Sequence, residues 1–477
     1  MTNYYTPGVY VEEISTLPPS VVDASTAIPA FLGYTERTDY NGVEQKLVPT
    51  RISTMLEFKQ YFGGPAPAKL DTSVKMTGAV PVFDKAGAFK QSIYTLYYAL
   101  DLFFKNGGSF CYIVSLGKYN SETIKVEDFT DGITALEKED EPTLLVVAEA
   151  CGLKSTEYYS VCKKALEHCA EVKNRFCILD VKDEKNGVDN FRTGVGQEWL
   201  KYGAAYYPYL KTTISARIRD ADITVTGITG GGTSNDTANP ENAAAPKSKT
   251  ILKTAGDKTL ADLETDYTGL YAAIKNELSD VKYKVVLPAS AAIAGVYASV
   301  DRDRGVWKAP ANVSLNGVIE PLTKITATEQ QNLNVHAGGG KSINAIRSFT
   351  GKGILVWGAR TLAGNDNEWR YVSVRRLFNM IEDSCSKASA FAVFEPNDPT
   401  TWLKVQSMLD SYLYGLWQQG ALVGPTAKAA YFVKVGLGST MTNQDVLEGR
   451  MIVEIGVAAV RPAEFILLRF SHKLQEA

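Results

Sequence analysis

The middle of the chain alternates short apolar runs with one long amphipathic segment, and this alternation constrains the fold more than any other feature. The runs FCYIVSL, PTLLVVAEA and RFCILDV are rich in β-branched and aromatic residues, as buried strands are. A helix is expected over residues 156–173, between the second and third runs. Strands joined through a helix of this length pair in parallel. The sequence therefore predicts a mixed α/β fold built on a parallel sheet.

Residue patterns and composition predict further elements in the first 312 residues, on both sides of this alternation. Residues 27–35 predict a buried strand and residues 91–108 a helix that ends at a glycine pair. Residues 72–89 are expected to form a loop. The run at 227–250 has no large apolar residue after its first two positions, so a flexible insertion is expected there. Residues 284–312 predict a helix of small residues ending in DRDRG.

Patterning is strongest in the last third of the chain. GILVWGART predicts a strand over 353–361, and an apolar stripe predicts a helix over 366–388. FAVFEPNDP, residues 391–399, is expected to complete a strand and begin a new helix. Three strand-like runs, AYFVKVGLG, RMIVEIGVAAVRP and AEFILLRFSHKL, then follow without a helix long enough to intervene.

The helix expected over 399–418 carries two different faces. Asp398 is its expected N-cap and Pro399 occupies the first helical position. The predicted buried stripe is Trp402, Val405, Leu409, Tyr412 and Leu416. The opposite face offers one charge among small polar groups, which is fewer than a merely solvated face normally carries. This second face consists of Thr400, Lys404, Ser407, Ser411 and Gln418.

YYTPGVYVEEIS, near the start, predicts a short strand with nothing nearby in sequence to pair with. Glu12 and Glu13 fall on opposite faces of that strand, so it lacks the in/out alternation of a strand lying on its own core. Unpaired backbone groups on a terminal strand are costly unless another strand meets them.

Size and charge exclude several classes of protein. The chain has 477 residues, enough for two or three domains. A formal charge of −3 gives no electrostatic reason to expect nucleic acid. Its six cysteines have no framework spacing, which favours free thiols in a reducing compartment. No apolar run reaches the roughly 18 residues of a membrane span, so residence in the cytoplasm until release by a machine or by lysis is expected.

Motifs for chemistry are weak. HAGGGKS at 336–342 lacks the glycine that a phosphate loop needs at position 335, and GLGSTM lacks the third glycine of a dinucleotide fingerprint. Cys162, His168 and Cys169 share a predicted helix, but no second ligand pair follows for zinc. No catalytic residue, cofactor or metal site is therefore predicted. A site of paired carboxylates stays open as an alternative, since carboxylates are plentiful.

Arginines gather in VRRLF (374–378) and DRDRG (301–305). Solvation or pairing within the chain is one interpretation of these groups. A contact between subunits, where arginine is enriched, is the other.

Several blocks together resemble one family. TPGVYVEEI, FFKNGGSFCYIV, GVWKAPAN, GILVWGARTL, YVSVRRLFNMIEDS, FEPNDPTTW and GRMIVEIGVAAVRPAEFILLRF resemble, in the same order, the contractile tail sheath proteins of phages and phage-like injection systems. The resemblance implies a multi-domain structural subunit that polymerises around an inner tube in an extended metastable state. Contraction then drives the tube through a target envelope, with no catalysis.

The resemblance also implies a domain plan and a set of partners. The expected parts are an N-terminal arm (1–20), outer α/β lobes (21–340), an inner tube-facing domain (341–460) and a C-terminal arm (461–477). The arms are expected to add strands to neighbouring subunits. A strand inserted in this way need not alternate buried and exposed residues as a strand on its own domain's core does. The expected arm contacts are Val9, Tyr10, Val11, Glu12, Glu13, Ile14, Phe465, Ile466, Leu467, Leu468, Arg469 and Phe470.

The expected partners are other copies of the chain, the inner tube protein, and baseplate and terminator or cap proteins, with no nucleic acid and no membrane insertion. Assembly is expected in the bacterial cytoplasm, as part of a phage tail or a tail-like particle. We expect Lys404, Ser407 and Ser411 to face the tube, because they lie on the low-charge side of their helix. A non-contractile tube or lattice protein and a cytoplasmic α/β enzyme with a carboxylate site are the alternatives.

Overall fold

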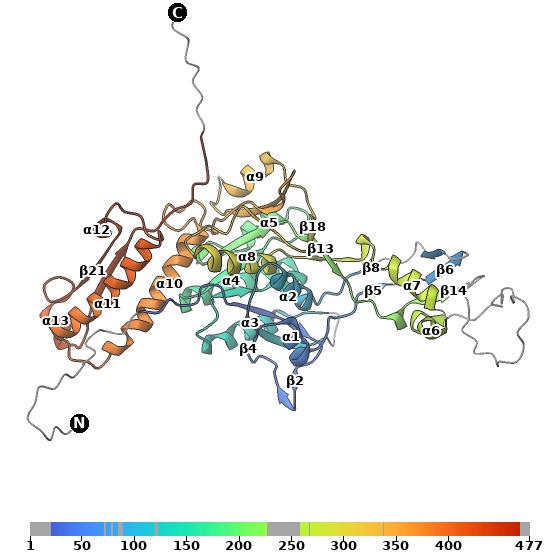
Figure 1. Ribbon diagram of the computed structural model, residues 1–477, viewed down its shortest axis with the longest axis horizontal. Coiled ribbons are helices and arrows are strands. Elements are labelled where there is room, and N and C mark those ends of the chain that lie inside the picture. Colours follow the sequence, from blue (N-terminus) through green and yellow to red (C-terminus); the bar gives the residue numbers. More distant parts are fainter. Residues whose placement is uncertain are drawn as a thin grey trace, which may run out of the picture. The chain divides into compact units, whose positions relative to one another are not determined.

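The computed structural model describes residues 21–70, 73–77, 80–83, 89–119, 123–226, 258–266, 268–336 and 338–467. Contacts within the chain define two compact units, whose elements are labelled in Figure 1. The large unit takes its described residues from 25–376 and 462–467, and the small unit from 21–24 and 377–461. Residues 341–376, expected at the start of the inner domain, thus belong to the large unit.

A nine-stranded sheet forms the centre of the large unit. The six strands from β19 to β9 in its order run parallel, and antiparallel strands flank them on both sides. The predicted parallel α/β arrangement is thus confirmed. In spatial order the strands are β17 (Val313–Ser314), β20 (Gly353–Val356), β19 (Ile343–Phe349), β12 (Gly203–Tyr207), β11 (Phe176–Asp180), β10 (Leu144–Val146), β1 (Pro29–Thr35), β9 (Cys111–Lys118) and β4 (Thr50–Ile52).

Helices cover both faces of this sheet, which explains why its strands are apolar throughout. All seven residues of β1 are buried, and their side chains alternate between two cores. Leu32 packs in the core under α3 and α4, whereas Phe31 packs in the core under α2 and α8. These helices are α2 (Leu96–Lys105), α3 (Val126–Ala135), α4 (Ser155–Val172) and α8 (Ser290–Arg304), with α1 (Met55–Phe62), α5 (Gly187–Gly194) and α9 (Ala327–Asn334) around them.

Smaller sheets extend the large unit. One contains β13 (Leu210–Ser215), β16 (Lys284–Leu287) and β18 (Val318–Pro321). Another contains β6 (Ser73–Thr77), β7 (Val80–Phe83), β14 (Thr224–Thr226) and β15 (Lys258–Thr259), next to α6 (Leu260–Asp266) and α7 (Thr268–Glu277). Two-stranded pairs join β2 (Asp39–Tyr40) to β3 (Val43–Glu44) and β5 (Lys69–Leu70) to β8 (Phe89–Lys90).

The expectation of a loop over 72–89 is wrong, because β6 and β7 pair there as antiparallel strands. The glycines of this stretch and Pro81 argue against a strand when the sequence is considered alone. Pro81 lies on β7, at the edge of its sheet, where its missing N–H breaks no ladder. On its other side β6 pairs in parallel with β14, a partner far along the chain that local patterning does not indicate.

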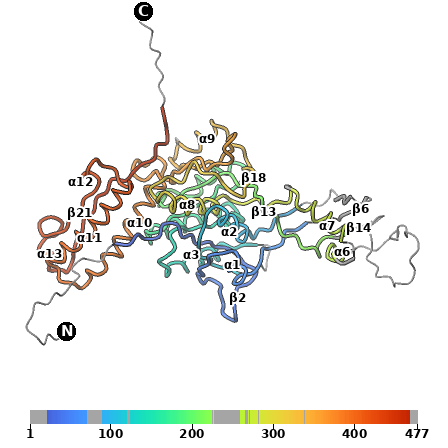
Figure 2. Tube along the Cα trace, in the orientation of Figure 1, coloured from blue at the N-terminus to red at the C-terminus, as the bar shows by residue number. Residues whose placement is uncertain are grey.

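The small unit combines helices with a two-stranded sheet. Its elements are α10 (Val372–Ser389), which begins in the large unit, α11 (Pro399–Gln418), α12 (Ala427–Ala430), β21 (Tyr431–Val435), α13 (Asn443–Leu447) and β22 (Val453–Val457). The predicted start of α11 is confirmed: the Asp398 carboxylate accepts the Thr401 N–H at 2.9 Å, and Pro399 follows as the first helical residue. Figure 2 shows the first described residues, in blue, running beside the orange α10.

One strand prediction in this region is wrong. Residues 391–399 contain a short 3₁₀ helix, Ala390–Ala392, followed by turns. The chain reverses there through Phe394, whose φ is 68°, and such a turn leaves no room for a ladder. Residues 463–467 form no strand within the chain, and their pairing with a neighbouring subunit stays a prediction. The insertion expected at 227–250 lies outside the described residues.

Candidate assembly site

The sheet of the small unit has an open edge along β22. Strands β21 and β22 pair antiparallel in the register Tyr431↔Val457 to Val435↔Val453, and in the described part of the chain neither pairs with a third strand. The Ala458 N–H donates to the Ala430 carbonyl, so these two residues form a hydrogen-bonded pair. Hydrogen-bonded pairs alternate along an antiparallel ladder, so the next such pair is Phe432 with Gly456. The N–H and C=O groups of Val453, Ile455 and Val457 therefore point outward from β22. These groups offer an edge on which a further strand can pair.

The two faces of this sheet differ. Tyr431 and Val433 are buried on the side that α11 covers. On the other side the Phe432 ring, 41% exposed, lies across Gly456, where a Cβ would come within 2.2 Å of the ring. The Lys434 ammonium sits 4.7 Å from the centre of that ring. A sheet of two strands is marginal alone, so added strands would complete it.

Helix α11 presents the face that the sequence analysis assigned to the tube. Lys404, Ser407 and Ser411 are all exposed. Leu403 and Tyr414, at 67% and 42% exposure, lie among them and were missed by the sequence analysis. Their spacing from Ser407, four and seven residues, is the signal that could have identified them. On the buried side Val405, Leu409 and Leu416 are covered as predicted, while Trp402 and Tyr412 are only partly covered.

The first described residues are held on the small unit, and we call residues 23–24 the N-terminal root. The Tyr412 hydroxyl of α11 donates to the Asp23 carboxylate at 2.9 Å. The Ala24 N–H donates to the Ser384 hydroxyl of α10, also at 2.9 Å. Burial is the main cause that raises the pKa of Tyr412 above its ordinary value, so this hydroxyl stays a donor at neutral pH.

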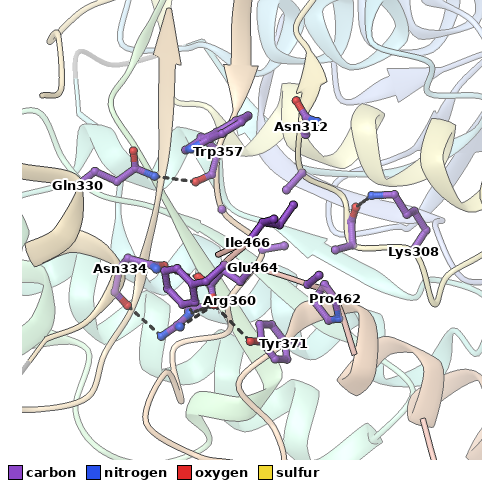
Figure 3. A pocket seen from close by; sticks show the side chains of 16 residues that line it. Lys308, Asn312, Gln330, Asn334, Trp357, Arg360, Tyr371, Pro462, Glu464 and Ile466 are labelled. Carbon is purple, nitrogen blue, oxygen red and sulfur yellow. Dashed lines mark hydrogen bonds and ion pairs between the residues drawn. The ribbon is translucent and has the colours of Figure 1, made fainter. Parts of the chain in front are cut away.

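Residues 462–464, the C-terminal root, are held on the large unit instead. The Glu464 carboxylate accepts from Arg360 Nη2 at 2.6 Å and from Arg360 Nε at 3.0 Å. Asn334 Nδ2 donates to it at 2.7 Å and the Tyr371 hydroxyl at 3.2 Å. The Arg360 side chain is 5% exposed and that of Glu464 is 21% exposed. Figure 3 shows these four side chains converging on one point.

The partners of Glu464 outweigh the cost of burying its charge. Burial alone would raise the pKa of Glu464, but the hydrogen bonds from Arg360 and Asn334 and the charge of Arg360 lower it below its usual range. Two nearly parallel N–H bonds to one carboxylate also fix the direction of the pair. We call Glu464 with Arg360, Asn334 and Tyr371 the carboxylate anchor.

The sheet positions Arg360 through its backbone. Asn344 of β19 accepts the Arg360 N–H and donates to the Arg360 carbonyl, both at 2.8 Å. The same amide donates to Ala205 of β12 at 3.2 Å. Gly358 allows this approach, because a Cβ there would lie 2.7 Å from the Asn344 amide oxygen. The anchor is therefore built on two neighbouring strands of the central sheet.

An open pocket of about 420 Å³ lies beside the C-terminal root. Trp357, Asn312 and Ile466 line it (Figure 3), and so does Phe465. The described residues beyond the root are little covered: Phe465, Ile466 and Leu467 are 72%, 79% and 84% exposed. Three consecutive apolar side chains thus remain available to a partner.

The arginines of VRRLF pair within the chain. Arg376 donates to Asp301 at 3.0 Å and to the Thr26 carbonyl at 2.8 Å, and its guanidinium lies 4.5 Å from the centre of the Tyr297 ring. Its side chain is 3% exposed and that of Asp301 is 6% exposed. Arg375 stacks 4.2 Å from the centre of the Trp369 ring. Pairing within the chain is therefore the correct interpretation for both. In DRDRG, Arg302 and Arg304 are exposed. Arg302 nevertheless also pairs within the chain, with the Asp303 carboxylate at 3.1 Å and the Gly107 carbonyl at 3.2 Å.

In α/β proteins, ligands commonly bind at the carboxyl ends of the parallel strands. Here two carboxylates of the protein itself occupy that position. Glu149 accepts the N–H groups of Tyr34, Thr95 and Leu96 at 2.6–2.7 Å, at the start of α2. Asp180 accepts the Ser290 N–H at 2.8 Å, at the start of α8. Burial raises the pKa of each of these carboxyl groups to about 7. The N-termini of α2 and α8 are thus each bound by a carboxylate of the protein itself.

Other sequence motifs serve the interior. Lys341 of HAGGGKS is 3% exposed and donates to the Arg192 carbonyl. His168 is buried against Arg175, and burial and that charge lower its pKa to about 4. In the described residues no group of three or more His, Cys, Asp or Glu side chains could hold a metal ion. No described helix combines the length and the apolarity needed to span a bilayer.

The predicted arm residues fall in two groups. Phe465, Ile466 and Leu467 are described and exposed. The others lie outside the described residues: Val9, Tyr10, Val11, Glu12, Glu13, Ile14, Leu468, Arg469 and Phe470. The sequence analysis did not predict Glu464 as an anchor. Open strand edges and exposed apolar segments are features of subunits that assemble by adding strands to one another.

Comparison with known families agrees with this class of protein. The phage tail sheath protein central domain matches residues 122–362, and the phage tail sheath C-terminal domain matches residues 364–473. The chain therefore belongs to the phage tail sheath family, whose members are structural proteins. The recognition made from the sequence blocks is confirmed.

Curated relatives align over part of their length. The tail sheath protein of Vibrio phage KVP40 is 26% identical over 185 residues, which cover 39% of this chain and 26% of that protein. The tail sheath protein of Enterobacteria phage T4 is 23% identical over 236 residues, 47% of this chain and 34% of that protein. The alignments thus span about a quarter to a third of these relatives.

Solved structures match along the whole chain. The sheath complex of the extracellular contractile injection system PVC, in its contracted state, is 30% identical with a TM-score of 0.66, covering 100% of this chain and 99% of that one. A chain of the anti-feeding prophage baseplate is 31% identical with a TM-score of 0.65, covering 99% and 100%.

Proposed function

We propose that this chain is the subunit of a contractile sheath that polymerises around an inner tube in an extended metastable state. Contraction of the sheath then drives the tube through a target envelope. The observation that carries the proposal is the whole-length similarity to the contracted sheath of an extracellular injection system, at 30% identity. The open edge of β22 is consistent with it, because a polymer held by added strands needs an edge that its own subunit leaves unpaired.

Strand addition between subunits supplies the cohesion in this proposal. Residues 9–14 and 465–470 are the strands that neighbours exchange. The tube-facing domain, expected over 341–460, consists mainly of the small unit's residues 377–460. Each added strand makes a few backbone hydrogen bonds worth about 1 kcal/mol net each. Because every subunit both gives and receives strands, weak links multiply into a mesh that holds through large rotations.

The partners follow from the same architecture. The chain assembles with other copies of itself, with the inner tube, with the baseplate at one end and with terminator or cap proteins at the other. Assembly takes place in the bacterial cytoplasm, and the particle is a phage tail or a tail-like injector. Solved relatives from sheath and baseplate assemblies of contractile systems support the first and third of these contacts.

Electron microscopy of the purified protein, with and without its tube protein, tests the proposal. Thick-walled hollow cylinders with helical symmetry, in a long and a short form, are expected. Smooth thin tubes or flat lattices would support a non-contractile structural protein instead. Dispersed particles under all conditions would contradict the proposal and would favour the alternative of a cytoplasmic α/β enzyme with a carboxylate-based site.

Deleting residues 1–15 tests the strand exchange separately. Cylinders of the deleted chain are expected to fail to form or to fall apart on contraction. Intact cylinders that survive contraction would show that this segment does not link subunits. Deletion of the same number of residues from 227–250, the predicted insertion, is the matched control and should leave cohesion unchanged.

The exposed face of α11 is the tube contact in this proposal. Charge reversal of Lys404 to Glu should slow tube-templated assembly, while assembly without a tube should be unaffected. Lys428 to Glu, a similar reversal elsewhere in the small unit, is the control. Equal templated assembly of both variants would remove Lys404 from the tube contact.

A further inference from the structure

The C-terminal segment is fastened to the large unit by charge rather than by apolar packing. After Glu464 the described side chains are 72–84% exposed, and an open pocket of about 420 Å³ lies alongside them. Glu464 itself is held by Arg360, Asn334 and Tyr371 (Figure 3). The grip on this segment is thus concentrated in one carboxylate.

Glu464 is bound to a different unit from the one that precedes it in sequence. Val460 still donates to the Ala421 carbonyl within the small unit, at 3.2 Å. The division between the units falls between Arg461 and Pro462, and Glu464 is then fixed on the large unit. Anything that pulls on residues beyond 464 therefore acts first on the large unit, although the segment directly follows the small unit in sequence.

We propose that Glu464 is the positioning residue of the C-terminal arm: its pair with Arg360 fixes where the arm leaves the subunit and passes the pull of a neighbour into the central sheet. This inference rests on the proposed function. The force then runs from the Glu464 carboxylate through two N–H bonds to Arg360, and from the Arg360 backbone through Asn344 to β19 and β12.

Burial suits the pair to this task. With the Arg360 side chain 5% exposed, water and salt screen the attraction far less than they screen a surface pair. A bidentate pair also resists rotation, since both bonds must lengthen together for the carboxylate to turn. The arm is therefore held at a fixed angle while its exposed apolar residues stay available for the neighbour.

The test compares sheaths of the full chain with those of Glu464→Gln, of the double variant Arg360→Met with Glu464→Gln, and of Glu320→Gln. Glu320, in an exposed pair with Lys211 at 3.8 Å, is the matched control in the same unit. The double variant removes the buried unpaired charge that the single variant leaves, so it separates folding from anchoring. Melting temperature reports folding for every variant.

The readout is the fraction of subunits that sediment as cylinders after contraction is triggered. A fall of at least tenfold is expected for Glu464→Gln and for the double variant, with the double variant melting within a few degrees of the native chain. The control should sediment as the native sheath does. A double variant that folds and stays fully cohesive would overturn the inference, and so would a cohesive single variant. Failure of the native chain to form contractile cylinders would instead contradict the proposed function.

Discussion

The two described ends of the chain are rooted differently. The N-terminal root lies on the small unit through two hydrogen bonds, from Tyr412 to Asp23 and from Ala24 to Ser384. The C-terminal root lies on the large unit through a carboxylate that takes bonds from three side chains. One root is a pair of hydrogen bonds near the surface, while the other is an ion pair whose arginine is buried. A neighbour that holds both segments would therefore grip two different units of the same subunit.

The largest effect is expected from breaking the stronger root. Glu464→Gln should destabilise the region around β19 by about 3 kcal/mol, because Arg360 is left buried without its carboxylate. Hydrogen exchange of peptides that cover residues 343–356 measures this loss. Glu320→Gln should change the same peptides by less than about 0.5 kcal/mol, as exposed pairs contribute little. Equal exchange in both variants would mean that the pair does not stabilise the sheet.

A smaller effect is expected when both partners of the pair are removed. Arg360→Met combined with Glu464→Gln should recover at least about 2 kcal/mol of that loss, because no buried charge then lacks a partner. A double-mutant cycle with Arg360→Met alone, measured by urea unfolding, gives the coupling between the two side chains. A coupling near zero would contradict the direct contact.

Acidity should weaken the C-terminal root. The pKa of Glu464 is lower in the folded chain than in the unfolded one, so the unfolded state binds more protons as the pH falls. The stability that Glu464 contributes is complete above its unfolded pKa of about 4.3 and is lost as the pH falls through the folded value. The stability difference between the native chain and Glu464→Gln should therefore shrink below about pH 4. Urea unfolding from pH 7 to pH 3 measures it, and a difference independent of pH would contradict the shift.

The smallest effect is expected at the N-terminal root. Tyr412→Phe removes one hydrogen bond to an exposed carboxylate, which water can solvate instead, so a loss of about 0.5–1 kcal/mol is expected. Proteolysis near residues 21–24 should become faster, while exchange at 343–356 stays as in the native chain. Tyr414→Phe, a half-exposed tyrosine of the same helix, is the control. A loss as large as that of Glu464→Gln would erase the difference between the roots.

Features could be predicted from the sequence when the residues that form them lie close together along the chain. Helix α11 was predicted to the residue, because its cap, its proline and its apolar period all lie within the helix or next to it. The parallel sheet followed from the strand–helix–strand order in the same way. The anchor could not be predicted, since Asn334 and Arg360 lie 130 and 104 residues before Glu464. Arg376 was left open between two interpretations for the same reason, as its partner Asp301 is 75 residues away.

The order in which the chain is synthesised gives the division into units a further consequence. Every strand of the central sheet has left the ribosome once Val356 has emerged. The small unit needs residues 377–461 as well as those at its beginning, so it closes later. Glu464 emerges after both. A nascent chain that stops short of this residue holds Arg360 in the large unit without the carboxylate that neutralises it, and is less stable for that reason. The bonds to Glu464 therefore form only after both units of the described chain have been synthesised.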